Sequence, residues 1–182
     1  MDNMLVLSKI LLMPAEWAHT ARLEKWRRGQ NALPLCVINS LLLQENHFDI
    51  DPASLTEQNW FFISRWEWFY PAAMMTAARQ LAPVFLRFPA SLGLLNADQR
   101  AFLYVPWFPS TQTMPDNQQP DFNTLEQQAY TSLMKAMHNR LPEPLIPLLA
   151  FLFPEHCKMP QLNADQTYPE DYSLFLQAIE YA

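Results

Sequence analysis

The residue types that most often do chemistry are few in this chain and widely spaced. Its histidines and cysteines are His19, Cys36, His47, His138, His156 and Cys157. Only His156 and Cys157 are adjacent, whereas a structural zinc site usually takes its ligands from two local pairs. No CxxC, HExxH, GxSxG, Walker A or GxGxxG pattern occurs in the sequence. We therefore expect no metal, no cofactor and no catalytic residue, and we do not expect an enzyme.

The charged residues are better explained by structure or by protein contacts. Glu170 and Asp171 follow Pro169, and acids at that place favour the positive end of a helix. Residues 22–28 carry a net charge of +3, from four basic residues and one acid, and residues 141–182 carry −5, from six acids and one lysine. Each cluster is either a solvated face or a docking surface for a partner. The candidate partner-binding residues of the basic cluster are Arg22, Lys25, Arg27 and Arg28.

The composition and the N-terminal sequence exclude some classes of protein. The chain has 182 residues, a net charge of −6 and 50% hydrophobic residues. A general nucleic-acid binder needs a basic surface to displace counterions, so we expect no nucleic-acid partner. The N-terminus has no basic start and no cleavage pattern of a signal peptide. No apolar run reaches the ~20 residues of a membrane span, and we expect a cytoplasmic protein.

The use of glycine and proline predicts a helical fold. The sequence has 2 glycines and 16 prolines. Few glycines leave few sites for tight hairpins, while spaced prolines mark the starts and ends of helices. We expect an all-α protein. It would form a single irregular helical domain over residues 1–182, with a Pro-rich loop at 106–121 and an acidic C-terminal segment at 155–182.

Local signals place the helices along the chain. The expected helices cover residues 14–28, 34–45, 54–70, 71–81, 96–105, 123–141, 144–154 and 169–181. Two of them begin at a capping box, Ser54 with Glu57 and Asn96 with Gln99. The helix 123–141 has an apolar residue at every fourth position from Leu125 onward. Two prolines are expected to interrupt helices: Pro71 ends or kinks the helix 54–70, and Pro147 bends the helix 144–154.

An unusual density of aromatic side chains marks residues 60–70, where seven of eleven positions are Trp, Phe or Tyr. On one helix they would fall on almost every face, which predicts a core helix with one edge free for an interface. We expect Trp60 and Phe69 in the core and Trp68 at the edge. The candidate partner-binding aromatics are Trp68 and, in the Pro-rich loop, Trp107 and Phe108.

Three segments occur in an order and at a spacing that resemble a known family. They are ILLMPAEWAHTARLE, then SLTEQNWFFISRWEWFYPAA with its continuation to LLNADQRAFLYV, and LMKAMHNRLPEPLIPLLAFLFPE. Pro14, Trp17 and His19 mark the first segment, paired tryptophans the second, and Leu-Pro-Glu with Leu-Phe-Pro the third. Together they resemble the SctK family of type III secretion proteins, which includes OrgA, MxiK and YscK.

The resemblance implies a non-enzymatic adaptor in the cytosolic sorting platform beneath a bacterial injectisome. It implies two partners, the SctQ pod protein and the cytoplasmic forkhead-associated domain of the inner-membrane ring protein SctD. The chain would then reach the membrane only through protein contacts. The resemblance assigns no catalytic residue and no binding surface. Two alternatives stay open: a secretion chaperone or effector-loading adaptor that binds an unfolded export segment, and, less favoured, a small helical enzyme.

Overall fold

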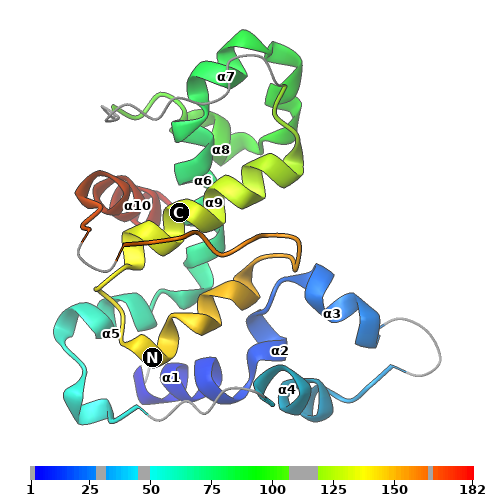
Figure 1. The fold of residues 1–182 in the computed structure, drawn as a ribbon, viewed down its shortest axis with the longest axis vertical. Coiled ribbons are helices and arrows are strands. Elements are labelled where there is room, and N and C mark those ends of the chain that lie inside the picture. Colours follow the sequence, from blue (N-terminus) through cyan, green and yellow to red (C-terminus); the bar gives the residue numbers. More distant parts are fainter. Residues whose placement is uncertain (1–2, 28–31, 45–49, 107–118, 164–165) are drawn as a thin grey trace. The chain divides into compact units, whose positions relative to one another are not determined.

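The structure is a computed structural model that describes residues 3–27, 32–44, 50–106, 119–163 and 166–182 (Figure 1). In these ranges every regular element is an α-helix or a 3₁₀-helix, which confirms the all-α fold predicted from the shortage of glycine. Prolines stand in the first turn of α2 (Pro14–Trp17), α7 (Ala82–Arg87) and α10 (Pro169–Tyr181). In the first turn the fixed φ of proline suits a helix, and its missing N–H would have had no partner within the helix.

The chain is divided into two compact units. Unit 1 comprises Met1–Glu67 and Asn139–His156, and unit 2 comprises Trp68–His138 and Cys157–Ala182. The chain therefore crosses between the units three times, and each unit is built from two separate stretches of sequence. The expectation of a single domain over residues 1–182 stays a prediction.

Unit 1 is a set of short helices around a small core. Its elements are α1 (Asn3–Leu12), α2, α3 (Thr20–Arg27), α4 (Leu35–Leu43), η1 (Pro52–Ser54), α5 (Glu57–Ile63), η4 (Glu143–Leu145) and η5 (Pro147–Leu152). Ile38 of α4 is buried with Ala15, Ala18 and Leu23, and Phe151 packs against this cluster. Two aromatic contacts extend it, because the ring of Trp17 lies 5.5 Å from that of Trp66 and 6.2 Å from that of Phe151.

The helix predicted over residues 14–28 is wrong as one piece, since it is broken into α2 and α3. Ala18 is extended, with ψ of 151°. The amide of His19 donates to the carbonyl of Phe151 at 2.8 Å instead of to the carbonyl four residues before it. That freed carbonyl, of Ala15, accepts from the Arg27 guanidinium at 2.7 Å. Both groups exposed by the break thus find partners distant in sequence. Gly29, which directly follows the predicted helix in the sequence and is predicted to end it, lies outside the described residues.

The capping box predicted at Ser54 and Glu57 is wrong by two residues. The box that forms joins Thr56 and Asn59 at the start of α5. The Ser54 hydroxyl instead donates to the Asp51 carbonyl at 2.7 Å, within η1. Asn59 also donates its side-chain amide to the Arg140 carbonyl at 2.9 Å. This second contact favours the cap at Thr56, because it ties the amide side chain of the box to a residue distant in sequence.

The aromatic segment 60–70 is three pieces rather than one helix. α5 ends at Ile63, η2 covers Trp66–Trp68, and α6 (Phe69–Gln80) takes Pro71 into its first turn, so Pro71 does not end the aromatic helix. Phe69 is fully buried, as expected, whereas Trp60 is only half-buried. Trp68 is 41% exposed, which agrees with the predicted edge position. The prediction for Trp60 failed because it assumed one continuous helix, whereas the helix ends at Ile63 and the residues after it do not continue its spacing.

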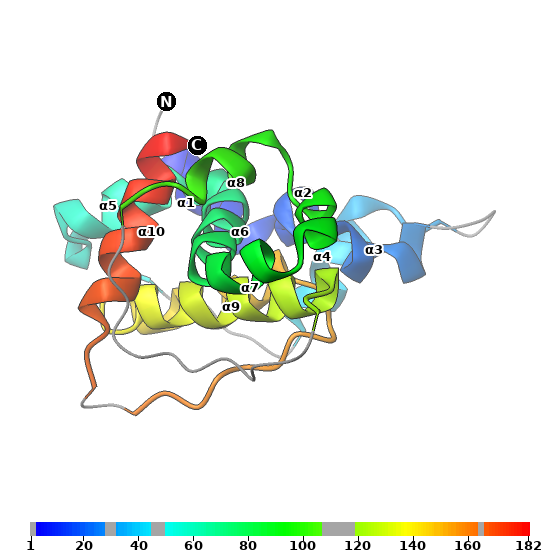
Figure 2. The ribbon, with the colours of Figure 1, turned by 90° about the horizontal axis from the view of Figure 1, so that it is seen from above.

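Unit 2 is built around α6, with α9 (Phe122–Met137) and α10 packed against it and α8 (Ala97–Phe102) beside it (Figures 1 and 2). η3 (Pro89–Leu94) follows α7. Residues 72–78 of α6 are all buried, and four of them are alanines. The small side chains let neighbouring helices approach on several sides, and a helix that is buried all round must be central.

Several predicted details of unit 2 are confirmed. Asn96 and Gln99 form the capping box that begins α8. On α9 the predicted positions Leu125, Ala129, Leu133 and Met137 are all fully buried. The helix ends at Met137 rather than at the predicted residue 141, and the chain then enters unit 1 and turns at Asn139, where φ is 59°. Asparagine tolerates this left-handed conformation better than most residues, so the turn is locally encoded.

Other predicted details need correction. Where a bent α-helix was expected over residues 144–154, the chain forms the 3₁₀-helices η4 and η5, which end at Leu152, because prolines at 142, 144 and 147 leave few amides for α-helical bonds. The buried stripe of α10 is Asp171, Leu174, Phe175, Ala178 and Ile179. From the four- and three-residue spacing of Tyr172, Phe175, Leu176 and Ile179 the sequence predicts that these four form the apolar side of this helix, but Tyr172 and Leu176 are only half-buried beside the stripe. Most of the Pro-rich loop, residues 107–118, lies outside the described residues.

Candidate interaction surfaces

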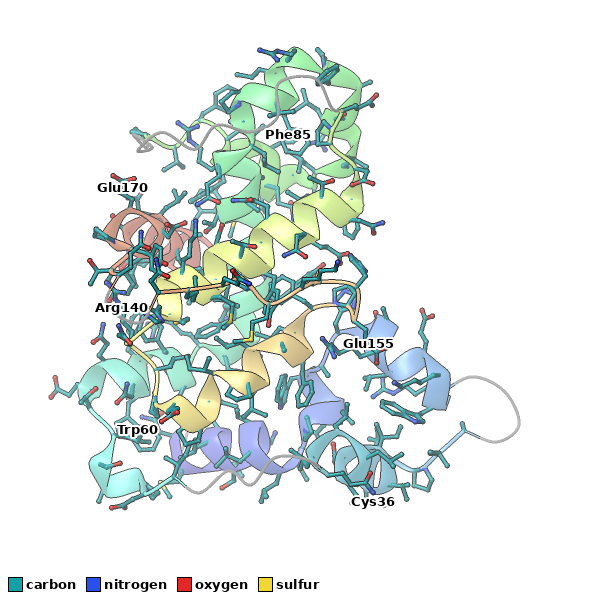
Figure 3. All side chains as sticks on the ribbon, in the orientation of Figure 1. Cys36, Trp60, Phe85, Arg140, Glu155 and Glu170 are labelled. Carbon is teal, nitrogen blue, oxygen red and sulfur yellow. The ribbon has the colours of Figure 1, made fainter. Side chains whose placement is uncertain are left out.

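The described residues hold no arrangement suited to metal binding. Within them no group of three or more His, Cys, Asp or Glu side chains lies close enough to hold an ion. Cys36 is exposed on α4 (Figure 3), and Cys157 is buried in unit 2. The expectations of no cofactor and no catalytic residue stay predictions. The surfaces and the buried polar contacts are therefore the features to consider.

Two arginines of the basic cluster on α3 contact their own chain. The Arg22 Nε donates to the Phe153 carbonyl, and its guanidinium lies 5.7 Å from the centre of the Phe151 ring. Arg27 donates to the Ala15 carbonyl, which closes the break between α2 and α3. Reversing the charge of Arg27 would therefore affect folding as well as any partner. Arg28 lies outside the described residues.

Lys25, the third cation of this cluster, forms an exposed ion pair. Its ammonium lies 2.8 Å from Glu155 Oε1 and 4.3 Å from the centre of the Trp26 ring. The hydrogen bond from Lys25 holds the pKa of the Glu155 carboxyl below its ordinary value. Both side chains are more than half exposed, and such pairs contribute only ~0–1 kcal/mol. Figure 3 shows Glu155 beside α3, so part of the acidic C-terminal segment neutralises part of the basic cluster.

Of the aromatic residues predicted to bind a partner, the structure describes only Trp68. Its side chain is 41% exposed at the end of η2, between the buried Trp66 and Phe69. Trp107 and Phe108 lie outside the described residues. Trp68 is thus available for a contact. It belongs to unit 2, whereas Arg22, Lys25 and Arg27 belong to unit 1.

Sequence reasoning missed an uncharged, accessible surface of unit 1, which lies on α4. Only Ile38 of this helix is buried, whereas Leu35, Cys36 and Val37 are exposed. The signal was present in the sequence, because residues 32–44 contain no charged side chain. A helix that carries no charge and still exposes aliphatic side chains is unusual on the surface of a monomer.

Unit 2 contains a connected polar cluster where α6, α9 and α10 meet. Gln80 is its centre: its Nε2 donates to Asp171 Oδ1 at 2.9 Å, and its Oε1 accepts from Gln128 Nε2 at 2.7 Å. The Ser132 hydroxyl also donates to the same Gln80 oxygen. One residue from α6 thus joins two from α9 and one from α10. Asp171 and Ser132 are buried, so these bonds replace contacts with water.

A second buried polar contact lies between α6 and α9. The Tyr70 hydroxyl donates to Glu126 Oε1 at 3.1 Å, and Glu126 is only 2% exposed. Burial, and then the negative charge of Glu126, raise the pKa of the Tyr70 hydroxyl above its ordinary value. Tyr70 therefore remains a neutral donor, and the pair holds two helices together rather than exchanging protons.

Asp171 makes the stability of unit 2 depend on pH. Burial raises its pKa above the ordinary 3.8, although the Lys135 ammonium and the Gln80 hydrogen bond partly oppose this. Between the ordinary and the raised pKa the folded state binds more protons than the unfolded state, so stability falls as pH rises through this window. We expect Asp171→Asn, which is neutral at every pH, to be more stable than the wild type at neutral pH.

The measurement is a set of urea melts at pH values from below 3.8 up to neutrality. The advantage of Asp171→Asn should shrink as the pH falls through the window. Glu180→Gln, at an exposed position of the same helix, is the control. An equal or lower stability of Asp171→Asn at neutral pH would show that the carboxylate is adequately compensated in the folded protein.

These features describe an all-helical protein whose accessible surfaces suit protein contacts. The described part of the chain has no helix that is long and apolar enough to cross a membrane. The family model of the bacterial type III secretion apparatus proteins OrgA and MxiK matches residues 7–182. The chain belongs to this OrgA/MxiK family and is a type III secretion apparatus protein. Comparisons with curated proteins and with solved structures gave no match.

Proposed function

We propose that the chain is a non-enzymatic adaptor of the cytosolic sorting platform, which links the SctQ pod protein to the cytoplasmic forkhead-associated domain of SctD. The observation that carries this proposal is the family match, which extends over residues 7–182. An adaptor needs surfaces for two partners, and two compact units can each supply one. The chain would then be held at the cytosolic face of the inner membrane by protein contacts.

The residues that would contact these partners are proposals as well. They are Arg22, Lys25, Arg27, Arg28, Trp68, Trp107 and Phe108. Trp68 is the best supported of them, because a large aromatic side chain that is 41% exposed suits the centre of an interface. Arg22 and Arg27 are the least supported, because both already bind backbone carbonyls of unit 1.

The adaptor function predicts two separate complexes and one joint complex. We expect the purified full-length chain to bind folded SctQ and, independently, the cytoplasmic domain of SctD from the same organism. The reason is that a linker must engage both proteins at once. Titration calorimetry measures each affinity, and size-exclusion chromatography with light scattering measures the three-component assembly.

The same experiment separates this function from that of an export chaperone. A chaperone would bind an unfolded export substrate of the same secretion system and neither folded protein. Binding of the substrate alone would therefore contradict the adaptor function. Binding of only one of the two folded partners would contradict the link between them.

A further inference from the structure

Residues 151–155 of unit 1 supply three hydrogen-bond acceptors to α3 and to the residue that precedes it. The donors stand at three-residue spacing and the acceptors at two-residue spacing. The pairs are His19 with Phe151, Arg22 with Phe153, and Lys25 with Glu155. The first two acceptors are backbone carbonyls, whereas the third is a carboxylate that lies beside α3 (Figure 3). The row therefore ends in a contact between two side chains.

This last contact can open without disturbing the other two. The side chains of Lys25 and Glu155 are 53% and 58% exposed, so both remain hydrated when they separate. Phe153, by contrast, is fully buried, and its carbonyl keeps its bond from Arg22. The Lys25 ammonium can therefore exchange one carboxylate for another while the rest of unit 1 stays folded.

Lys25 is held in position for such an exchange. Its ammonium lies 4.3 Å from the centre of the Trp26 ring, and Trp26 packs against the buried cluster that contains Leu23. Arg22 adds a second positive charge: the hydrogen bond from Lys25, and then the charges of Lys25 and Arg22, hold the pKa of the Glu155 carboxyl below its ordinary value. Two cations beside a fixed ring thus form a pre-organised site for a carboxylate, which loses less conformational entropy on binding.

The charge of α3 indicates the chemistry of the group that binds there. The helix has a net charge of +2, from three basic residues and one acid, whereas the whole chain has −6. An acidic surface is therefore its complement. Anionic lipids and nucleic acids are poorer matches, because they are held by several cations at once. Arg22 and Arg27, the two arginines of α3, already bind backbone carbonyls of unit 1.

We propose that Glu155 is an internal stand-in for an acidic side chain of a protein partner, and that this side chain replaces Glu155 on Lys25 when an acidic segment docks on α3. The inference rests on the proposed function in taking the partner to be a protein, and it adds the chemistry of one contact surface. The internal pair weakens the apparent affinity, because only the molecules in which Lys25 is released are competent to bind. It also disfavours segments without an acid, since these open the pair and supply nothing in its place.

The test titrates the full-length chain with a hexaglutamate peptide and follows the amides of α3 by two-dimensional NMR, which reports both the site and the affinity. We expect Glu155→Gln to bind the peptide about two- to fivefold more tightly than the wild type, because an exposed ion pair is a weak competitor. Lys25→Gln should bind it about two- to fivefold more weakly. Glu143→Gln is the matched control, because it removes the same charge from an exposed position of unit 1, on η4. Its affinity should change less than that of Glu155→Gln.

A second variant keeps the ion pair and reverses its polarity. Lys25→Glu combined with Glu155→Lys leaves two opposite charges in contact at exposed positions, so we expect an unchanged melting temperature. The double variant should no longer respond to hexaglutamate at α3, because the cation that receives the peptide is gone. A response as strong as that of the wild type would overturn the proposal.

Other outcomes also overturn the proposal. Equal affinities of Glu155→Gln and Glu143→Gln would show that net charge alone governs binding. Binding to phosphatidylserine vesicles that Lys25→Gln abolishes, without any response to hexaglutamate, would assign α3 to a lipid surface instead. If the wild type binds neither SctQ nor SctD, the adaptor function fails, and that result is distinct because the hexaglutamate titration requires neither protein.

Discussion

Replacing Phe69 with alanine is expected to lower the free energy of unfolding by about 3–5 kcal/mol. Phe69 is the first residue of α6 and is fully buried in unit 2. Its ring packs edge-to-face on that of Phe175 in α10, with 5.5 Å between the ring centres and 90° between the planes. Alanine would leave a cavity that the surrounding helices fill only in part, and would remove this aromatic contact.

The measurement for Phe69→Ala is a urea melt followed by circular dichroism. Total stabilities of domains are about 5–15 kcal/mol, so the predicted loss is a large part of the whole. Trp68→Ala is the matched control, since it removes a larger side chain from the adjacent position, where the residue is 41% exposed. A loss for Phe69→Ala no greater than that for Trp68→Ala would contradict the burial of this residue.

Replacing Gln80 with leucine is expected to cost about 3 kcal/mol, the second largest effect. The change leaves Asp171, Gln128 and Ser132 without their shared partner at the junction of three helices. An orphaned buried polar group costs about 1–3 kcal/mol, and more when it is charged. Part of the cost is recovered because Gln128 also has a bond to Ser132, at 3.4 Å.

The loss of stability in Gln80→Leu should be greatest where α10 packs against α6, because the bond to Asp171 joins these two helices. Hydrogen exchange should therefore become faster in α10 (Pro169–Tyr181) before it changes in α9. Gln177→Leu is the matched control, because Gln177 is exposed on α10. Equal costs for the two substitutions would show that the polar cluster contributes nothing to stability.

Local sequence signals predicted the helices whose ends depend on neighbouring residues. The cap at Asn96 and Gln99, the proline at the start of α10 and the four-residue spacing on α9 all act within one or two turns. The left-handed turn at Asn139 is equally local, but it was not predicted, because the helix was expected to continue to residue 141. Such features can be predicted because both partners of each interaction lie in the same short window of sequence.

Features that depend on distant residues were predicted wrongly or not at all. The break at His19 requires the carbonyl of Phe151, and the cap at Thr56 is favoured by the bond from Asn59 to residue 140. Asp171 was assigned to the helix dipole, but it is buried against Gln80. In each case the competing partner is more than 80 residues away in the sequence.

By itself, the sequence determined that the protein is helical, that it lacks any familiar catalytic or metal-binding motif, and that it resembles the family to which it belongs. Only the tertiary structure decided which side chains remain free for other molecules. It assigned the Arg22 and Arg27 guanidinium groups to backbone carbonyls of unit 1, and it left Leu35, Cys36 and Val37 of α4 exposed. The physical reason is that the backbone hydrogen bonds and caps of a helix join residues within about one turn of each other, whereas exposure depends on what the rest of the chain places against a side chain.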